Sequence, residues 1–224
     1  MSDGRGSIVV VGAGPGVGAS VARRFGRDGH SVGLIARNRQ RLDALAASLD
    51  ADGIASGVAV ADAREPGAVR EAMGVLERAL GPAEVLCVSP LPDVATIKPV
   101  ADTTAEDLRE ALALGVVGTA AAVGCVVPAM RAAGRGSLLF TTGSAALTPN
   151  SGRATSGVVN AAQSVYIRML HDSLAQDGVY ALHAVIVGPI GDGGHDPADI
   201  AEAIWQAHSA RSEAQIVIRR DDPR

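Results

Sequence analysis

Short apolar runs rich in valine, isoleucine and leucine alternate with longer segments of helical periodicity along the whole chain. This alternation is typical of repeated βαβ units and predicts a parallel sheet. The expected strands cover residues 7–12, 30–36, 53–61, 83–88, 136–142, 179–187 and 214–219. Because crossovers between parallel strands are right-handed, we expect an α/β fold: a single Rossmann-type, doubly wound domain over residues 1–224, with helices on both faces of a seven-stranded sheet.

Two of the intervening helices carry clear signals in the sequence. In the first helix, Val17, Val21 and Phe25 recur at four-residue spacing and form one apolar stripe that can face the sheet. The last helix is announced by Asp196 as N-cap and Pro197 in the first turn.

The segment from Ala111 to Met130 is uncharged and about as long as a membrane-spanning helix. Its high content of alanine and glycine makes transfer into lipid weaker than for a leucine-rich span. The segment also follows Thr103-Thr104-Ala105-Glu106, a capping box that is typical of the start of a soluble helix. We therefore expect no membrane span, but a helix over residues 103–132 that packs between its own sheet and a partner subunit.

Composition narrows the function classes. The net charge of −4 arises from acidic and basic residues scattered along the chain, without the basic stripe that nucleic-acid binding requires. Cys87 and Cys125 lie in apolar surroundings, which favours reduced core thiols over a disulfide or a metal site. The first residues lack the pattern of a signal peptide. We expect a cytoplasmic protein that binds neither nucleic acid nor metal.

A glycine-rich turn, Gly12-Ala13-Gly14-Pro15-Gly16-Val17-Gly18, follows the first expected strand and leads directly into a helix. Backbone N–H groups at a helix N-terminus can bind the pyrophosphate of a dinucleotide, and glycine leaves room for its approach. The alternative is an ordinary strand-to-helix turn tightened by glycine. The coincidence of strand, turn and helix favours a nicotinamide dinucleotide.

The residues after the second expected strand indicate which nicotinamide cofactor binds. An acidic residue usually binds the ribose hydroxyls there, but this sequence reads Ala36-Arg37-Asn38-Arg39. A guanidinium suits a ribose 2′-phosphate, so Arg37 favours NADP(H) over NAD(H). Alternatively, both arginines are solvated residues at the start of a helix, although cations there oppose the helix dipole and attract an anion.

By these residues the chain resembles the short-chain dehydrogenase/reductase family over nearly its whole length. The spacing Gly12-x-x-x-Gly16-x-Gly18 is similar to that family's glycine turn, and Asp62-Ala63 look like its adenine-contacting pair. Where the family has Asn-Asn-Ala-Gly after strand four, this chain has Val88-Ser89-Pro90-Leu91. The resemblance implies that Ser89 and Pro90 line the cofactor pocket, with a wall that differs from the family's.

The family's chemistry rests on a serine, an asparagine and a Tyr-x-x-x-Lys pair, with the tyrosine as proton donor or acceptor. Ser144 matches the serine, and the alignment of the next helix places Ser156 at the tyrosine position and Asn160 at the lysine position. Gly115 falls on the asparagine. The only tyrosines are Tyr166 and Tyr180 and the only lysine is Lys98, so the chain contains no Tyr-x-x-x-Lys pair. The candidate catalytic residues are therefore Ser144, Ser156 and Asn160.

The family's substrate-covering segment is short here, because only residues 188–195 follow the sixth strand before the last helix begins. Asp192 and His195 on this loop are expected to be solvated or capping residues rather than catalysts.

Three functions remain open: an atypical NADP(H)-dependent oxidoreductase acting on a small organic metabolite, a non-redox cyclase, isomerase or dehydratase, and an NADP(H)-sensing binding protein. The two long helices, 103–132 and 153–176, pair across a twofold axis in the family, which implies a homodimer or homotetramer.

Overall fold

The computed structural model describes residues 5–220, and its strands form one seven-stranded parallel sheet in the order β3-β2-β1-β4-β5-β6-β7. The strands are β1 Ser7–Val11, β2 Ser31–Ala36, β3 Ser56–Val60, β4 Ala83–Val88, β5 Gly136–Gly143, β6 Val179–Val187 and β7 Gln215–Arg219. The predicted α/β Rossmann-type sheet is confirmed. The third strand is shorter than expected, since Gly53 (φ 76°) and Ile54, whose N–H bonds to Leu49 O, still belong to the turn that closes the preceding helix.

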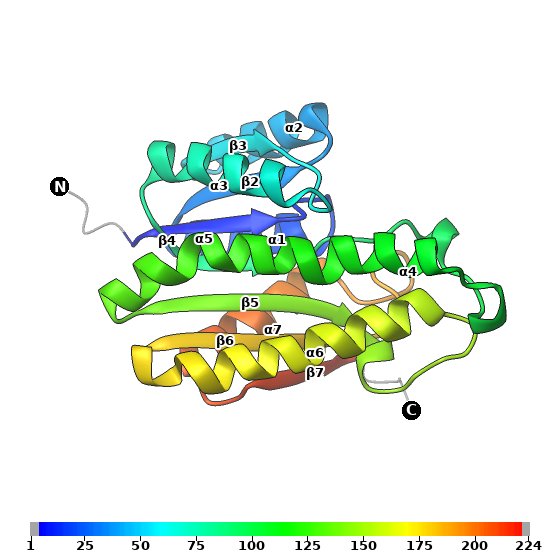
Figure 1. Ribbon diagram of the computed structural model, residues 1–224. Helices are drawn as coiled ribbons and strands as arrows, with labels where there is room; N and C mark the ends of the chain where they lie inside the picture. The colour runs from blue at the N-terminus through cyan, green and yellow to red at the C-terminus, as the bar shows by residue number, and fades with distance from the viewer. Residues whose placement is uncertain (1–4, 221–224) are drawn as a thin grey trace.

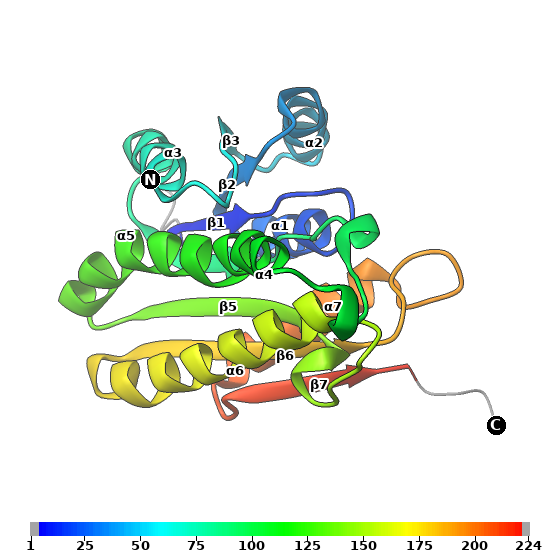
Figure 2. The same cartoon turned by 45° about the vertical axis from the view of Figure 1, so that its right-hand side comes forward.

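Helices cover both faces of the sheet (Figures 1 and 2). One layer consists of α1 (Val17–Arg27), α2 (Arg39–Ala51) and α7 (Pro197–Ala210), and the other of α3 (Pro66–Leu80), α5 (Gly118–Ala133) and α6 (Ala154–Leu174). Each face of the sheet has its own hydrophobic core, and successive strand residues belong to opposite cores. Ile8 and Val10 pack with the first helix layer, while Val9 and Val11 pack with the second. Burial on both faces explains why these strands are almost uniformly apolar.

The helix expected over 103–132 is interrupted. It consists of α4 (Ala105–Leu112), a π-helical segment η3 (Ala113–Val117) and α5. Its capping box joins Thr104 to Asp107, so the predicted box, starting at Thr103 with Glu106, was wrong by one residue. The hydroxyl of Thr103 instead donates to Pro99 O and closes the preceding turn, which delays the start of the helix.

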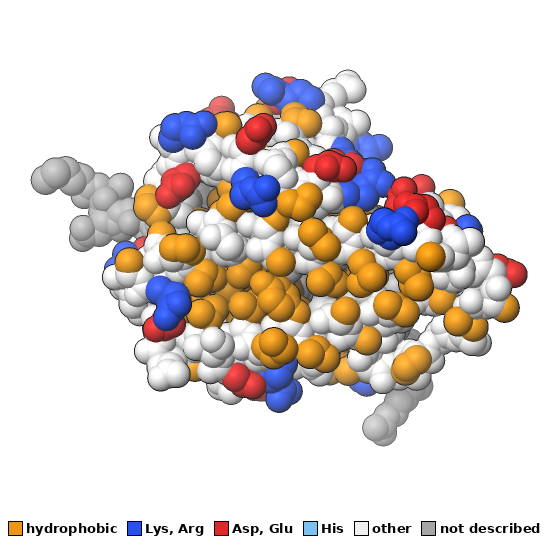
Figure 3. All heavy atoms as spheres, viewed as in Figure 1, with side chains coloured by type: hydrophobic (Ala, Val, Ile, Leu, Met, Phe, Trp, Pro, Cys, Tyr) orange, Lys and Arg blue, Asp and Glu red, His pale blue; other side chains and the backbone are white. Residues whose placement is uncertain are grey.

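The run Ala105–Ala133 is the one helix among the described residues that is long and apolar enough to cross a membrane by length and composition, with a mean hydropathy of 2.0 over its most apolar stretch. In this structure it contacts α3, β4 and α6 as one layer over the sheet. A core helix passes the same test, and the arrangement is the one expected for a helix packed on its own sheet. Figure 3 shows that its outward side, together with that of α6, carries many apolar side chains.

Cys87 and Cys125 are both free thiols. Complete burial raises the pKa of Cys87 to about 12, so this thiol stays protonated and chemically inert in the core.

Candidate functional site

The glycine turn connects the end of β1 to α1 and lies at the edge where the parallel strands end. Gly12 adopts φ 89°, and its N–H and that of Ala13 both donate to Ile35 O, at 2.9 and 3.1 Å. A Cβ on Gly12 would lie 2.6 Å from both Pro90 N and Ser89 O, and a Cβ on Gly18 would lie 2.5 Å from Gly12 O. Two of the glycines are thus required by the packing of the turn itself.

The other two glycines of the turn face open space. A Cβ on Gly16 would meet nothing within 4 Å, and one on Gly14 would meet only Gly12 O at 4.0 Å. Helix α1 starts at Val17 without a side-chain cap, and within residues 5–220 the N–H groups of Gly16, Val17 and Gly18 have no backbone acceptor. Free donors at a helix N-terminus, reached past glycines without side chains, fit an anionic diphosphate.

Two arginines follow β2, and they have different partners. The Arg39 guanidinium is 2.9 Å from Asp43 Oδ1 one turn along α2. Arg37 is exposed and forms no ion pair with any other described residue. Asn38 caps α2 by accepting a bond from Arg41 N at 2.9 Å. Of the two predicted cations, Arg37 is the one left free to meet an anion.

Asp62 and Ala63 follow β3, the strand next to β2, at the same end of the sheet. Both oxygens of Asp62 are bound by Arg64, the shortest distance being 2.7 Å from Nη2. The Arg64 hydrogen bonds are the main reason that the pKa of Asp62 is below its ordinary value, and the charge of Arg37 contributes to the same shift. The Arg64 guanidinium was not predicted from the sequence, although an arginine two residues after an aspartate could have indicated this pair.

Ala63 is positioned by close backbone packing. A Cβ on Gly118, the first residue of α5, would lie 1.8 Å from Ala63 O. Only glycine allows α5 to approach the end of β3 this closely. No sequence signal marks this contact, because Gly118 is one of several small residues in an apolar helix.

Ser89 and Pro90 form the wall beside the glycine turn. The N–H of Ser89 donates to Val11 O at 2.9 Å, and its Oγ accepts from the Thr141 hydroxyl at 2.7 Å. Ser89 is therefore held between β1 and β5, and Pro90 lies against Gly12. Thr141 is a member of this wall that sequence reasoning missed.

Two of the three candidate catalytic residues, Ser144 and Asn160, lie at the end of β5. Ser144 is exposed and begins a short 3-10 turn, η4 (Ser144–Ala146), directly after the strand. Asn160 on α6 donates from Nδ2 to Gly143 O at 3.3 Å, next to Ser144. Ser156 lies four residues before Asn160 on the same face of α6. Two hydroxyls and an amide can orient a substrate, but none of them is a strong acid or base near neutral pH.

Gly115, which the resemblance predicts at the position of the family's asparagine, lies inside η3 and is buried. A Cβ on Gly115 would lie 2.3 Å from Val159 Cγ1 of α6. Its carbonyl accepts the Thr119 hydroxyl at 2.6 Å. The backbone at this position is π-helical, and glycine has no side chain that could contact a substrate.

The single lysine is bound by a carboxylate. Lys98 lies in the loop before α4 and bonds both oxygens of Asp107 at 2.8 and 2.9 Å, which helps to lower the pKa of that carboxyl to about 2. Tyr180 donates to Glu213 O at 2.6 Å, and as the second residue of β6 it lies at the opposite end of the sheet from Ser144, which follows the parallel strand β5. Burial raises the pKa of Tyr166, which makes its hydroxyl a poorer acid.

The short loop after β6 is closed by His195. This residue is buried, its Nε2 lies 2.9 Å from Val187 O, and its N–H donates to Pro189 O. Asp192, at the tip, is exposed. These hydrogen bonds give His195 a structural role in closing the loop. Among the described residues no cluster of three His, Cys, Asp or Glu side chains is placed to hold a metal ion.

The fold and the glycine turn define a Rossmann-type nucleotide-binding protein. Comparison with known proteins identifies the family. The family model for short chain dehydrogenases matches residues 7–193. The chain therefore belongs to the short-chain dehydrogenase family, whose members are NAD(P)-dependent oxidoreductases.

Individual relatives are distant. Gluconate 5-dehydrogenase of Gluconobacter oxydans (strain 621H) is 33% identical over 78 residues, which covers 35% of this chain and only 30% of that protein. A longer match is to 2,3-dihydro-2,3-dihydroxybenzoate dehydrogenase of Bacillus subtilis (strain 168), 25% identical over 197 residues, covering 88% of this chain and 72% of that protein.

Solved structures share the whole fold. A short-chain dehydrogenase from Rhodopseudomonas palustris superposes with a TM-score of 0.86 at 24% identity, covering 96% of this chain and 99% of the other. An NADPH-bound short chain oxidoreductase from Pseudomonas aeruginosa PAO1 that contains an atypical catalytic center superposes with a TM-score of 0.84 at 20% identity, covering 95% of this chain and 94% of the other. At these identities the likeness shows the fold.

Proposed function

We propose that this chain is an NADP(H)-dependent oxidoreductase that acts on a small organic metabolite through an active site without the family's Tyr–Lys pair. The observation that carries the cofactor part is the open helix N-terminus at Gly14, Gly16 and Val17, together with the guanidinium of Arg37 at the next strand end, which forms no ion pair among residues 5–220. The whole chain, residues 1–224, acts as one domain in this proposal.

The residues present fit the cofactor. N–H groups of Gly16, Val17 and Gly18 would hold the diphosphate, Arg37 the 2′-phosphate, and Asp62 and Ala63 the side of the adenine. Ser89 and Pro90 would form the wall towards the nicotinamide. When bound, NADP(H) supplies or accepts the hydride.

The chain's own polar groups orient the substrate. Ser144 and Asn160 flank the end of β5 and can hydrogen-bond a carbonyl or imine nitrogen of the substrate. Neither can supply a proton readily, so the reaction must require little acid help, as with an iminium or an activated enone, or must take its proton from water near Ser156. Orientation next to the cofactor can still provide a large part of the rate enhancement.

The solved relative from Pseudomonas aeruginosa supports this proposal by analogy. It is an NADPH-bound oxidoreductase of the same fold, and its catalytic center is atypical. A departure from the family's catalytic set is thus compatible with a working cofactor site on this scaffold.

A second candidate keeps the cofactor site but not hydride transfer. The lack of a titrating side chain among Ser144, Ser156 and Asn160 equally suits an NADP(H)-sensing protein, or a non-redox cyclase, isomerase or dehydratase. The two free cysteines agree with a protein of the reducing cytoplasm under either candidate.

The assembly we propose is a homodimer or homotetramer. Val117 on the helical run before α5, and Val158, Val165 and Met169 on α6, are between 44% and 61% exposed, on the face where Figure 3 shows apolar side chains gathered. A continuous apolar face on two neighbouring helices is suited to packing against a second copy of itself.

Two measurements test the proposal. Titration of the protein with NADPH, followed by cofactor fluorescence, is expected to saturate, and NADH is expected to bind more weakly. Incubation with carbonyl, enone and imine panels is expected to consume the NADPH absorbance at about 340 nm for one substrate class. Saturable binding without consumption would favour the sensor or the non-redox enzyme, and the absence of saturable binding of both cofactors would refute the cofactor site.

A further inference from the structure

The side-chain amide of Asn160 offers an acceptor at the candidate active site. Its Nδ2 donates to Gly143 O at 3.3 Å, and Gly143 directly precedes Ser144. The Gly143 carbonyl fixes the orientation of the amide, because a carbonyl oxygen accepts only from the NH₂ end. Asn160 Oδ1 is then left as an acceptor without a hydrogen-bond partner among residues 5–220. The position that the resemblance matches to the family's lysine therefore holds a neutral acceptor in place of a cation.

The surroundings of this acceptor carry an excess of negative charge. Three loops follow the neighbouring parallel strands β4, β5 and β6 at one edge of the sheet (Figure 2): residues 89–104, 144–153 and 188–196. They contain four aspartates against one lysine and one arginine. The lysine, Lys98, is ion-paired with a carboxylate of α4 at 2.8 Å, so Arg153 is the one cation of these loops without an ion pair among the described residues. Such an edge repels an anionic substrate and attracts a cationic one.

Apolar side chains are exposed on the same three loops. They are Leu91 (78% exposed) and Val94 (60%) after β4, Leu147 (39%) after β5 and Ile190 (41%) after β6. Leu147 belongs to the turn that begins at Ser144, since its N–H donates to Ser144 O at 2.9 Å. Several apolar side chains gathered at one edge, beside a few polar groups, are suited to the hydrocarbon body of a ligand.

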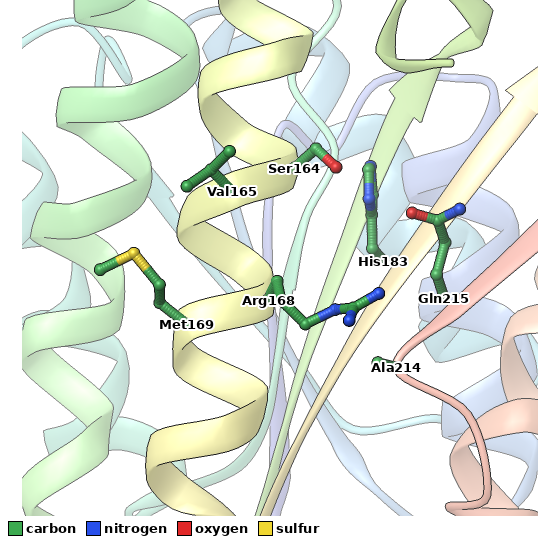
Figure 4. Close-up of a pocket in the computed structure, with 7 residues that line it drawn as sticks. All are labelled: Ser164, Val165, Arg168, Met169, His183, Ala214 and Gln215. Carbon is green, nitrogen blue, oxygen red and sulfur yellow. The ribbon is translucent and has the colours of Figure 1, made fainter.

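A hollow of about 280 Å³ between α6 and the last two strands is not assigned to this ligand (Figure 4). Its lining includes Val165 and Met169, on the face of α6 that we propose is covered by a second copy of the chain. None of the three candidate catalytic residues lines it. The strand-end edge around Ser144 and Asn160 is therefore the place of the substrate.

The candidate catalytic residues restrict the chemistry, because none of them donates a proton readily near neutral pH. Hydride addition to a ketone or an enone leaves a negatively charged oxygen, which needs a proton or strong donors. Hydride addition to an iminium needs neither. The hydride forms the new C–H bond, the C=N π pair becomes the lone pair of a neutral amine, and NADPH, as the source of the hydride, is oxidised to NADP⁺.

We propose that the substrate of this site is a hydrophobic iminium, the protonated form of an imine. This inference rests on the proposed oxidoreductase function and names its substrate class. The iminium N–H donates to Asn160 Oδ1, and the hydrocarbon body covers Leu147 and Ile190. The imine takes its proton from water before it binds, so the protein needs no acid of its own.

Steady-state kinetics at saturating NADPH test the electrophile. 3,4-Dihydroisoquinoline, in mildly acidic buffer where the imine is largely protonated, is compared with 1-tetralone, a neutral ketone of the same bicyclic shape. The iminium should have a kcat/KM about tenfold or more above that of the ketone, as one charge-assisted hydrogen bond can provide. The inference is overturned if 1-tetralone is reduced as efficiently as the iminium.

Substitutions of Asn160 test the acceptor. Asn160→Lys places a cation at this position and should lower kcat/KM for the iminium about tenfold or more, with a smaller change for the ketone. Asn160→Leu removes the acceptor without adding a charge and should act in the same direction, which keeps the test valid if Asn160→Lys does not fold. Ala47→Lys, at an exposed position of α2 on the other face of the sheet, is the charge-matched control and should change neither value. Equal losses for iminium and ketone in both Asn160 variants would refute the role of the acceptor.

Leu147→Ser tests the apolar contact. It should raise KM for 3,4-dihydroisoquinoline more than for 1-pyrroline, because the one-ring imine has little hydrocarbon to place against Leu147. An equal change for both imines would contradict the contact.

Binding without cofactor separates this inference from the proposed function. 1,2,3,4-Tetrahydroisoquinoline, whose ammonium form carries a positive charge and N–H donors, should bind in a calorimetric titration more tightly than 1-tetralone does. A protein that binds NADPH but not this ammonium overturns the substrate class alone. A protein that binds the ammonium but not NADPH refutes the proposed cofactor site and with it the reduction of an iminium.

Discussion

Val159 Cγ1 occupies the space next to Gly115 where a side chain would begin: a Cβ on Gly115 would lie 2.3 Å away. Valine is stiff in a helix, because its β-branched side chain strongly prefers one rotamer, so it cannot move aside cheaply. The position predicted to match the family's asparagine is therefore closed to a larger side chain by packing.

Gly115→Asn should accordingly destabilise the protein by about 1–3 kcal/mol, the usual cost of overpacking a buried site. Thermal unfolding should show a melting temperature lower by several degrees, at roughly 2–4 °C per kcal/mol for a chain of this size. Gly67→Asn, on α3 with nothing within 4 Å of its Cβ position, is the control. Combining Gly115→Asn with Val159→Ala should recover part of the loss, and equal damage with and without Val159→Ala would contradict the steric explanation.

The two kinds of glycine in the turn should respond differently to substitution. Gly16→Ala should fold normally, because Gly16 has φ −92° and free space at its Cβ, but it should weaken NADPH binding at least tenfold by obstructing the phosphate site. Gly12→Ala should instead lower the melting temperature, since its φ of 89° and the Ser89–Pro90 backbone leave no place for a methyl group. Fluorescence titration and thermal melting of the same two samples check both statements. A Gly16→Ala protein that binds NADPH normally would remove the phosphate role of this turn.

Substitutions of Arg37 and Arg39 form a matched pair of variants that tests the preference for NADPH over NADH. Arg37→Gln should raise the NADPH dissociation constant by about 10-fold to 100-fold, as expected for loss of one charge-assisted hydrogen bond of roughly 1.5–3 kcal/mol, and should leave NADH binding nearly unchanged. Arg39→Gln should have little effect, because Arg39 is already paired with Asp43. The measurement is a titration with both cofactors at fixed ionic strength. An equal loss of NADPH and NADH affinity in Arg37→Gln would show that Arg37 does not read the 2′-phosphate.

The assembly is tested on α6. Val165 is 61% exposed, and Val165→Glu places a charge on the apolar face that we propose is covered by a second copy. The mass measured by light scattering should fall towards that of the monomer, 22.6 kDa. Val75→Glu, an exposed valine on α3 (45%), should leave the mass unchanged. A monomeric mass for the unmodified protein would already refute the assembly.

Acid should destabilise the protein partly through His208. Burial lowers the pKa of this side chain to about 4, with additional repulsion from Arg211, His30 and Arg5 and a small opposing effect of Asp28. Between about pH 6.5 and pH 4 the histidine is neutral in the folded state and protonated in the unfolded state. The stabilisation is therefore complete above pH 6.5 and is lost as the pH falls through this window.

His208→Phe keeps a ring beside Phe25 and Trp205 but removes the titration. Urea unfolding at several pH values should show a shallower loss of unfolding free energy in the variant, by up to about 1.4 kcal/mol per pH unit. Some dependence should remain, because the pKa values of His30 and His183 are lowered as well. Identical slopes for the variant and the unmodified protein would show that His208 titrates normally in the folded state.

Most elements were predictable because their signals are local. The strands are apolar runs bounded by turns, and the cap at Asp196 and the apolar stripe of α1 appear in the structure as expected. Errors arose where a neighbouring contact decided the boundary: Thr103 bonds to Pro99 and shifts the capping box to Thr104, and the turn at Gly53 shortens β3.

The sequence alone determined the class of fold, the glycine turn and the absence of a Tyr-x-x-x-Lys pair, because each is a matter of residue type and spacing along the chain. Only the tertiary structure decided which charged side chains already have an ion-pair partner. Among residues 5–220 it showed that Arg39 is paired with Asp43 while Arg37 has no ion-pair partner, and that Lys98 is bound to Asp107. The physical reason is that a side chain's chemistry depends on its partners, and these partners are brought from distant parts of the chain by packing.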